Sequence, residues 1–167
     1  MALIDFKDSH MNMVRPGLIM YGLYPRNDLV KRLKLKPALT LKTKVSYVKS
    51  VSKGRGISYG RTFITQKKTR IATIPIGYGD GYSRHLSNRA DVLIKGIRAP
   101  IIGRICMDMS MVDVGHLENI RAGDEVVLIG KQGKEMITVQ ELAISMDTIP
   151  YEVVCNIGRR VPRVYIK

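Results

Sequence analysis

Residues 38–52, ALTLKTKVSYVKSVS, decide the fold class of this chain. Apolar and polar side chains alternate along the stretch with a period of two. The larger side chains that share one face of such a strand are Leu39, Leu41, Val45, Tyr47 and Val51. This alternation is typical of a half-buried β-strand rather than a helix. The stretch therefore predicts β-structure from residue 38 onward.

The chain beyond residue 52 continues in short runs that are cut by glycine or proline. These runs are ISYGRTFIT, TRIATIPIG, DVLIKG, RAPIIGRI, SMVDV and GDEVVLIG. Many short strands with frequent turn residues are typical of a small β-barrel or sandwich. We therefore expect a mostly β fold, a small barrel or sandwich-like domain with one or two short helices.

The helices are expected near the C-terminus. In TVQELAISM, Thr138 stands three residues before Glu141, which is the spacing of a capping box, and apolar residues follow at helical spacing. TIPYEVVCNIG predicts a second short helix, begun by Thr148 and Pro150 and ended by Gly158. The closing segment VPRVYIK predicts a strand.

Residues 1–25 differ from the rest of the chain. RPGLIMYGLYP carries an apolar run between proline and glycine, which predicts a buried strand that leaves into a loop. Residues 26–37 are basic and are expected to form a connector. We therefore expect three regions, residues 1–25, 26–37 and 38–167.

The composition is that of a soluble globular protein, with 45% hydrophobic and 25% charged residues. No apolar run approaches the roughly 20 residues that span a bilayer, and the N-terminus does not have the pattern of a secretory signal. Cys106 and Cys155 lie far apart and form no CxxC pair, so a reduced, cytoplasmic chain is favoured over a disulfide. The net charge of +14 suggests polyanions, anionic substrates or a missing acidic partner surface.

Two glycine-rich stretches place tyrosines beside arginine. In GRGISYGRTF, Tyr59 lies between Arg55 and Arg61, and in IGYGDGYSR, Tyr78 and Tyr82 alternate with glycines. The common role of such tyrosines is packing, and Asp80 is suited to capping a tight turn. The alternatives are a general acid or base at Tyr59 and a ligand-facing loop at 76–84.

Two further stretches carry groups with possible chemistry. GRICMDMSMVD, residues 103–113, has no histidine and no second close cysteine, so we expect no metal site there, and Met107 and Met109 are by default core residues. GRRVPR, residues 158–163, is either a solvated basic patch or a phosphate-binding segment.

Taken in order, six stretches of the chain resemble the bacterial alanine racemase family. They are RPGLIMYGLYP, GISYGRTF, IPIGYGDGYSR, PIIGRICMDMSMVDV, GDEVVLIG and YEVVCNIGRRVPRVY. The resemblance covers nearly the whole chain from about residue 11, and it is to the C-terminal part of that enzyme only. It implies a mostly β C-terminal domain, preceded by the last strand of a (β/α)8 barrel whose remainder is absent here.

The resemblance also implies an activity and its partners. Family members are cytoplasmic homodimers that interconvert L- and D-alanine with pyridoxal 5'-phosphate (PLP) and so supply D-alanine for peptidoglycan. Each active site combines one subunit's barrel with the other subunit's C-terminal domain. We expect the chain to bind neither nucleic acid nor membrane, and to need the missing barrel for activity.

Site residues follow from the matched motifs. Tyr59 matches the catalytic tyrosine, which handles the Cα proton on one face of the substrate. Met107 matches the residue whose backbone N–H contacts the substrate carboxylate. The residues that match positions along the substrate entryway are Tyr78, Arg84 and Arg104. The residues that match positions around the cofactor are Arg15 at the pyridine nitrogen, Gly17 and Leu18 near the phosphate, and Arg159.

The sequence departs from the family at two points. Nothing here matches the lysine that binds PLP covalently and acts as the second base. Arg159 stands where many members have tyrosine, so that a preference for serine or another amino acid is an alternative to alanine. A different class is a small basic β-barrel that binds nucleic acid, with base stacking by Tyr47, Tyr59, Tyr78 and Tyr82.

Overall fold

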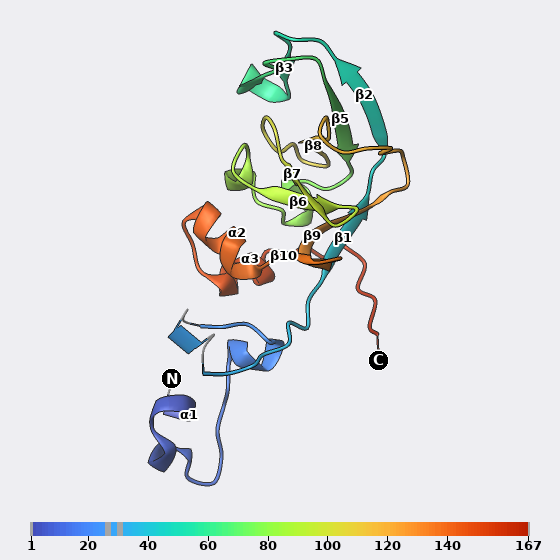
Figure 1. The fold of residues 1–167 in the computed structure, drawn as a ribbon. Coiled ribbons are helices and arrows are strands. Elements are labelled where there is room, and N and C mark those ends of the chain that lie inside the picture. Colours follow the sequence, from blue (N-terminus) through green and yellow to red (C-terminus); the bar gives the residue numbers. More distant parts are fainter. Residues whose placement is uncertain (1, 26–27, 30–31, 167) are drawn as a thin grey trace. The chain divides into compact units, whose positions relative to one another are not determined.

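The computed structural model describes residues 2–25, 28–29 and 32–166 (Figure 1). The chain divides into two compact units, Met1–Ala38 and Leu39–Lys167.

The first unit consists of short helical turns. Its described residues include α1 (Ala2–Asp5) and the 3-10 helices Lys7–His10 and Leu18–Tyr21. Gly22 ends the last of these with φ 73°, and its N–H donates to the carbonyls of Leu18 and Ile19. Leu18, Leu23 and Leu29 are buried.

The strand predicted within residues 15–25 is wrong, because Leu18–Tyr21 is a 3-10 helix. Among the described residues of this unit no strand is available to pair with it, so local bonds such as Met20 N–H to Gly17 O satisfy the backbone instead. Of the connector expected over residues 26–37, residues 26–27 and 30–31 lie outside the described residues.

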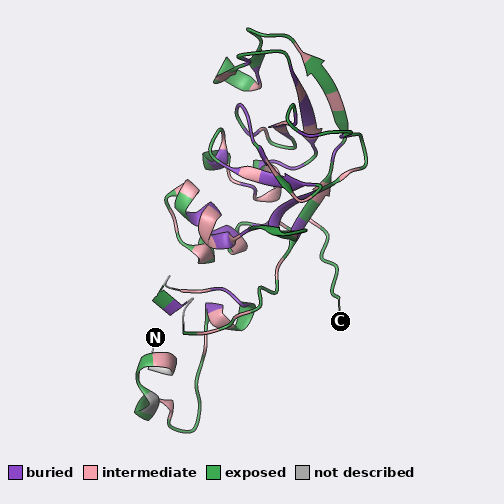
Figure 2. Ribbon diagram, in the orientation of Figure 1, coloured by how far each residue is buried: buried purple, intermediate pink, exposed green. Residues whose placement is uncertain are grey.

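The second unit is built on antiparallel sheets. The largest has the order β1 (Leu41–Lys44), β9 (Glu125–Gln132), β6 (Asp91–Ile94) and β7 (Ile97–Pro100), and β10 (Glu135–Ile137) also pairs with β9. The central strands β6 and β9 are buried along consecutive residues, including Val126–Ile129, so both faces of this sheet are covered (Figure 2).

Two smaller sheets complete the unit. One has the order β2 (Tyr47–Val51), β5 (Thr69–Ile74) and β8 (Ser110–Asp113), and the other pairs β3 (Gly56–Ile57) with β4 (Phe63–Ile64). A single bridge between Ile101 and Val112 links the chain after β7 to β8. The predicted mostly β class is confirmed, and the sheets remain open rather than closing into a barrel.

The stretch 38–52 forms two strands instead of one. The hydrogen-bonding partner strand changes between Val45 and Ser46. The Val45 N–H donates to Asp124 O at 2.9 Å, and the Ser46 N–H donates to Thr73 O at 2.9 Å. The chain therefore passes from the β9 sheet to the β5 sheet at this point. Leu41 and Val45 are buried as predicted, but Tyr47 beyond the change is 59% exposed.

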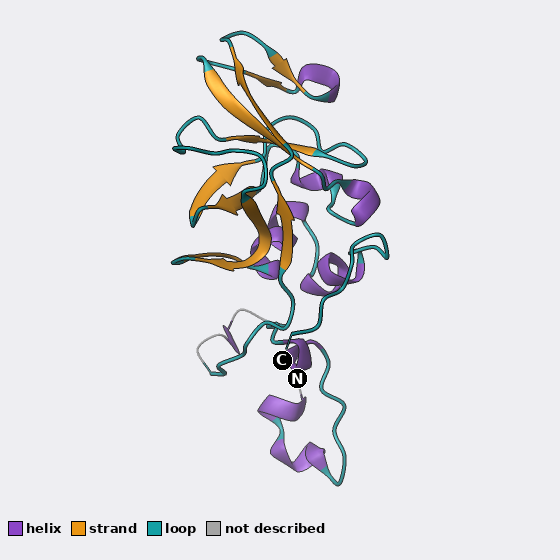
Figure 3. Cartoon of the chain, turned by 90° about the vertical axis from the view of Figure 1, so that its right-hand side faces the viewer, coloured by secondary structure: helices purple, strands orange, loops and turns teal. Residues whose placement is uncertain are grey.

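Two α-helices follow the sheets, and in Figure 3 most helical turns of this unit lie on one side of its strands. The predicted helix α2 (Val139–Met146) is confirmed, and the Thr138 hydroxyl accepts the Glu141 N–H at 3.1 Å. The second predicted helix is also confirmed as α3 (Pro150–Cys155), with proline in its first turn, although it ends before Gly158.

The strand predicted at the C-terminus is wrong. Residues 161–166 form no regular element, and Val164, Tyr165 and Ile166 are almost fully exposed. No described strand pairs with this segment, and Pro162 has no N–H to contribute to a ladder. The described residues also contain no helix long and apolar enough to cross a membrane.

Candidate functional site

Three glycine-containing segments meet around one open groove of about 620 Å³ in the second unit. They are the turn at 58–61, the loop at 77–81 and the loop at 103–109. The residues that line the groove are Ser58, Tyr59, Tyr78, Cys106, Met107, Asp108, Met109 and Met111.

Tyr59 is carried by the first of these segments, the short 3-10 turn Tyr59–Arg61. The turn requires positive φ angles at Ser58 (61°) and Gly60 (70°). It is held in place by the Ser58 hydroxyl, which donates to Arg104 O at 2.5 Å. Gly103 approaches so closely that an added Cβ would lie 2.7 Å from Ile57 O. The Tyr59 side chain itself is 74% exposed, so it is not a packing residue within this chain.

Tyr78 is carried by the second segment, which lies directly on the third. The N–H groups of Tyr78 and Gly79 donate to the carbonyls of Cys106 (3.0 Å) and Met107 (2.9 Å). Only glycine fits at position 77, because a Cβ there would lie 2.1 Å from Cys106 O. Asp80 accepts the Gly77 N–H at 3.0 Å, so the capping role expected of Asp80 is confirmed in a loop that also lines the groove.

Met107 and Met109 are 51% and 43% exposed, and the default prediction that they are core residues is wrong. The loop that carries them is closed by Cys106 N–H to Met109 O at 2.9 Å, and the carbonyls of Cys106 and Met107 are used by the second segment. The Met107 N–H has no hydrogen-bond partner among the described residues. It is therefore free to donate to a ligand in the groove.

Arg160 connects the loops from the segment that follows α3. Its Nε lies 3.3 Å from Asp80 Oδ1, and its Nη2 lies 2.5 Å from Asp108 Oδ1. The hydrogen bond to Asp108, together with the charges of both carboxylates, raises the pKa of the Arg160 guanidinium. Arg160 was not singled out from the neighbouring arginines of GRRVPR, because its two partners are more than 50 residues away.

A second hollow of about 420 Å³ adjoins the groove through Tyr78, which lines both. Arg84 and His85 line its other side. The Arg104 guanidinium lies beside the Tyr59 turn, since an added Cβ on Gly60 would be 3.4 Å from Arg104 Cζ. Arg84 thus lines the second hollow and Arg104 lies beside the turn that carries Tyr59, and both are exposed.

Comparison with known proteins identifies the arrangement. A family model described as alanine racemase, C-terminal domain, matches residues 38–165. The chain belongs to the alanine racemase family. An alanine racemase of Halothermothrix orenii is 54% identical over 164 residues, and one of Methanococcus maripaludis is 50% identical over 167 residues. These matches cover 98% and 99% of this chain but 43% and 44% of the relatives, so the chain spans less than half their length.

Solved alanine racemase structures share the fold. The enzyme of Streptomyces lavendulae superimposes with a TM-score of 0.93 at 40% identity, covering 99% of this chain and 44% of that one. The enzyme of Clostridium difficile gives a TM-score of 0.91 at 46% identity, covering 99% and 43%. The family assignment from the six motifs is therefore confirmed.

The predicted site residues fall into two groups. Tyr59, Tyr78 and Met107 line the one groove. Arg84 lines the adjoining hollow, and Arg104 lies beside the Tyr59 turn. Arg15, Gly17 and Leu18 belong to the first unit, where Arg15 is exposed and the Leu18 side chain is 4% exposed. Arg159 is exposed in the second unit and lines neither the groove nor the adjoining hollow.

Tyr82 shows that the glycine–tyrosine pattern alone does not identify a site residue. Its side chain is 2% exposed and its hydroxyl has no partner among the described residues. Burial, and then the charges of Asp91 and Glu141, raise the pKa of this phenol. A buried ring cannot stack on a base, which removes Tyr82 from the nucleic-acid hypothesis.

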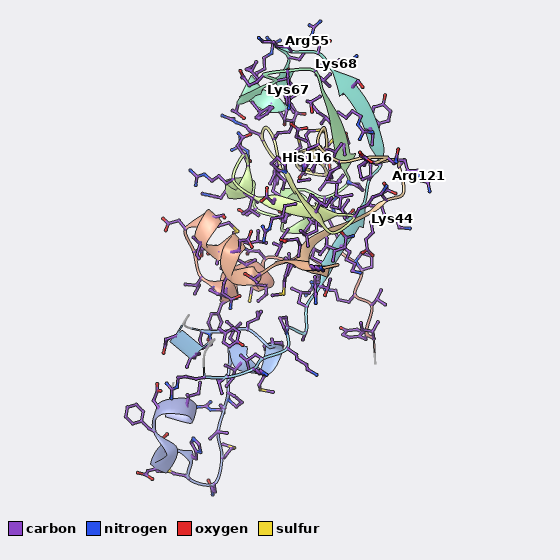
Figure 4. All side chains as sticks on the ribbon, in the orientation of Figure 1. Lys44, Arg55, Lys67, Lys68, His116 and Arg121 are labelled. Carbon is purple, nitrogen blue, oxygen red and sulfur yellow. The ribbon has the colours of Figure 1, made fainter. Side chains whose placement is uncertain are left out.

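Basic side chains are spread over the second unit rather than lining the groove. Arg55, Lys67 and Lys68 lie at the β3–β4 end, whereas Lys44 and Arg121 lie at another part of the unit (Figure 4). Cys106 and Cys155 are free thiols, and the described residues contain no cluster of three or more histidine, cysteine or acidic residues that could hold a metal ion.

Proposed function

We propose that this chain is the C-terminal domain of a homodimeric alanine racemase, and that Tyr59 acts in the active site of the partner subunit. The observation that carries the proposal is the exposed Tyr59 on a turn fixed by backbone contacts, beside the free Met107 N–H. Exposed apolar groups that cluster at such a groove favour contact with another surface. The assignment of residues 1–25 to the end of the barrel domain, 26–37 to a connector and 38–167 to the β domain is part of the same proposal.

The chemistry asked of Tyr59 is a proton transfer. Racemisation removes a proton from one face of Cα and returns one to the other face, so it needs two groups on opposite sides. Tyr59 is one such group, because a phenolate accepts a proton and the resulting phenol donates one, and the turn at 58–61 fixes its backbone. The other group, by the family resemblance, is a lysine outside this chain.

Met107 orients the substrate in this proposal. Its N–H has no hydrogen-bond partner among the described residues. It is suited to the carboxylate of an amino acid, since a charge-assisted hydrogen bond is stronger than a neutral one. The substrate then enters along a route lined by Tyr78 and Arg84 in the two hollows and by Arg104 beside the Tyr59 turn. The two arginines favour the approach of an anion.

The residues of this chain fit one part of PLP, the cofactor that the family implies. Gly17 and Leu18 begin a 3-10 helix, whose first N–H groups lack helical partners and are suited to a phosphate. Arg15, in the same unit, is an exposed cation suited to the ring nitrogen. When bound, PLP delocalises the negative charge that develops at Cα. The residues that would anchor it covalently belong to the barrel.

A chimeric enzyme tests the proposal. The part of the Halothermothrix orenii relative that precedes the matched segment is joined to this chain, and conversion of L-alanine and of L-serine is followed with PLP present. We expect alanine racemisation, reduced about 100- to 10,000-fold by Tyr59→Phe. Tyr47→Phe is the matched control, since Tyr47 is a similarly exposed tyrosine on β2 that does not line the groove.

Two results would contradict the proposal. One is a folded, dimeric chimera that racemises neither amino acid. The other is a Tyr59→Phe variant that is as active as Tyr47→Phe. Faster turnover of serine than of alanine would instead revise the substrate and leave the role of Tyr59 intact.

A further inference from the structure

Asp108 places a negative charge where an anionic substrate is expected to bind. It lines the groove, and its side chain is 53% exposed. It follows directly after Met107, so its Cα is about 3.8 Å from that of the lining residue whose N–H has no partner among the described residues. Both residues line the same groove, and charges act on each other over roughly 8 Å at physiological salt. An unpaired Asp108 would therefore repel a carboxylate at the Met107 N–H.

Arg160 is the only cation within ion-pair distance of Asp108 among the residues that the structure describes. The contact is short, with Nη2 2.5 Å from Oδ1. The same guanidinium also reaches Asp80, whose other oxygen already accepts the Gly77 N–H. The loop makes room for the arginine at Gly79, because a Cβ there would lie 2.5 Å from Arg160 Nη1.

We propose that Arg160 is a positioning residue that neutralises Asp108 and thereby allows an amino-acid carboxylate to bind at the Met107 N–H. The inference rests on the proposed function. The alternative role of Arg160 is a tether that only holds the Asp80 and Asp108 loops together. A tether requires the ion pair itself, whereas neutralisation requires only that position 108 carries no uncompensated charge.

A double-mutant comparison in the chimera separates these two roles. Arg160→Met leaves Asp108 uncompensated, and we expect KM for alanine to rise about three- to tenfold with kcat changed less than twofold. Asp108→Asn alone removes the charge and is expected to leave KM within about twofold of wild type. The double variant is expected to regain that KM.

Lys68→Met is the matched control. It removes one positive charge from an exposed residue that lines neither the groove nor the adjoining hollow, and it should leave KM unchanged. The neutralisation account is overturned if Asp108→Asn raises KM as much as Arg160→Met, if the double variant stays impaired, or if Lys68→Met has the same effect as Arg160→Met.

A binding measurement keeps the inference separate from the proposed function. Propionate has the carboxylate of alanine without its amino group, and the amide resonance of Met107 reports its binding without turnover. Weaker propionate binding in Arg160→Met that is restored by Asp108→Asn supports neutralisation, even if the wild-type chimera fails to racemise alanine. Equal propionate affinity in all variants contradicts it.

Discussion

Gly81 and Gly123 form a matched pair that tests how tightly the Tyr78 loop is packed. Both have positive φ angles, 95° and 94°, so alanine is strained at both positions. They differ in their surroundings. A Cβ on Gly81 would lie 1.8 Å from Asn156 O, whereas nothing lies within 4 Å of a Cβ on Gly123.

The expected losses of stability follow from the backbone strain and from the contact with Asn156. Gly123→Ala carries only the backbone strain, about 1 to 2 kcal/mol. Gly81→Ala carries the same strain. In addition, its Cβ and Asn156 O must separate by about 1.2 Å, because real Cβ contacts are not closer than about 3.0 Å. Such overpacking adds about 1 to 3 kcal/mol. The free energy of unfolding should therefore fall by about 2 to 5 kcal/mol in Gly81→Ala.

Urea unfolding of the 167-residue chain, followed by circular dichroism, measures both variants against wild type. The difference between the two losses isolates the contact with Asn156, since the strain is common to both. The Gly158 N–H bond to Asp80 O, at 2.8 Å, lies at this contact, so the loop that carries Tyr78 should loosen as well. Equal losses of stability in the two variants would refute the packing argument.

Further predictions at three positions concern stability. Tyr82→Phe removes a buried hydroxyl that has no partner and should stabilise the fold by up to about 1 kcal/mol; a loss above about 1 kcal/mol in thermal unfolding would contradict this. Because burial raises the Tyr82 pKa, wild type should lose up to about 1.4 kcal/mol per pH unit above about pH 10, where the unfolded phenol ionises, and Tyr82→Phe should not. The hydrogen bond from Lys42 lowers the Glu125 pKa, so Glu125→Gln should cost about 0.5 kcal/mol at pH 7. This difference should be lost as the pH falls below the ordinary carboxylate range and the native carboxylate takes up its proton, and a difference that persists at pH 2 would refute it. Thr138→Ala should cost about 1 kcal/mol in urea unfolding through loss of the α2 cap, whereas Thr138→Ser should cost little.

Features fixed by local sequence were predictable. The Thr138 cap and the proline at the start of α3 depend on neighbours within four residues, and both helices form where the pattern placed them. The break at Val45 was not predictable, because it depends on which distant strand supplies the partner. That choice involves Thr73 and Asp124, and no property of residues 38–52 contains it.

The candidate site shows the same limit. Tyr78 and Tyr82 stand in one glycine-rich stretch, yet one lines the groove and the other is buried. Their difference is set by what the fold packs around each ring. Likewise, Arg159 and Arg160 are adjacent, but only the latter reaches Asp80 and Asp108. The motif order identified the family, whereas the long-range contacts required the structure.

Exchange of the Cα hydrogen in deuterium oxide tests the role of Tyr59 most directly. In the Tyr59→Phe chimera, one enantiomer of alanine should still exchange its Cα hydrogen, through the base on the other face. The opposite enantiomer should exchange its Cα hydrogen more slowly than in the Tyr47→Phe control, by about 100-fold or more. Equal exchange of both enantiomers, whether both fast or both slow, would contradict the assignment of Tyr59 to one face of the substrate.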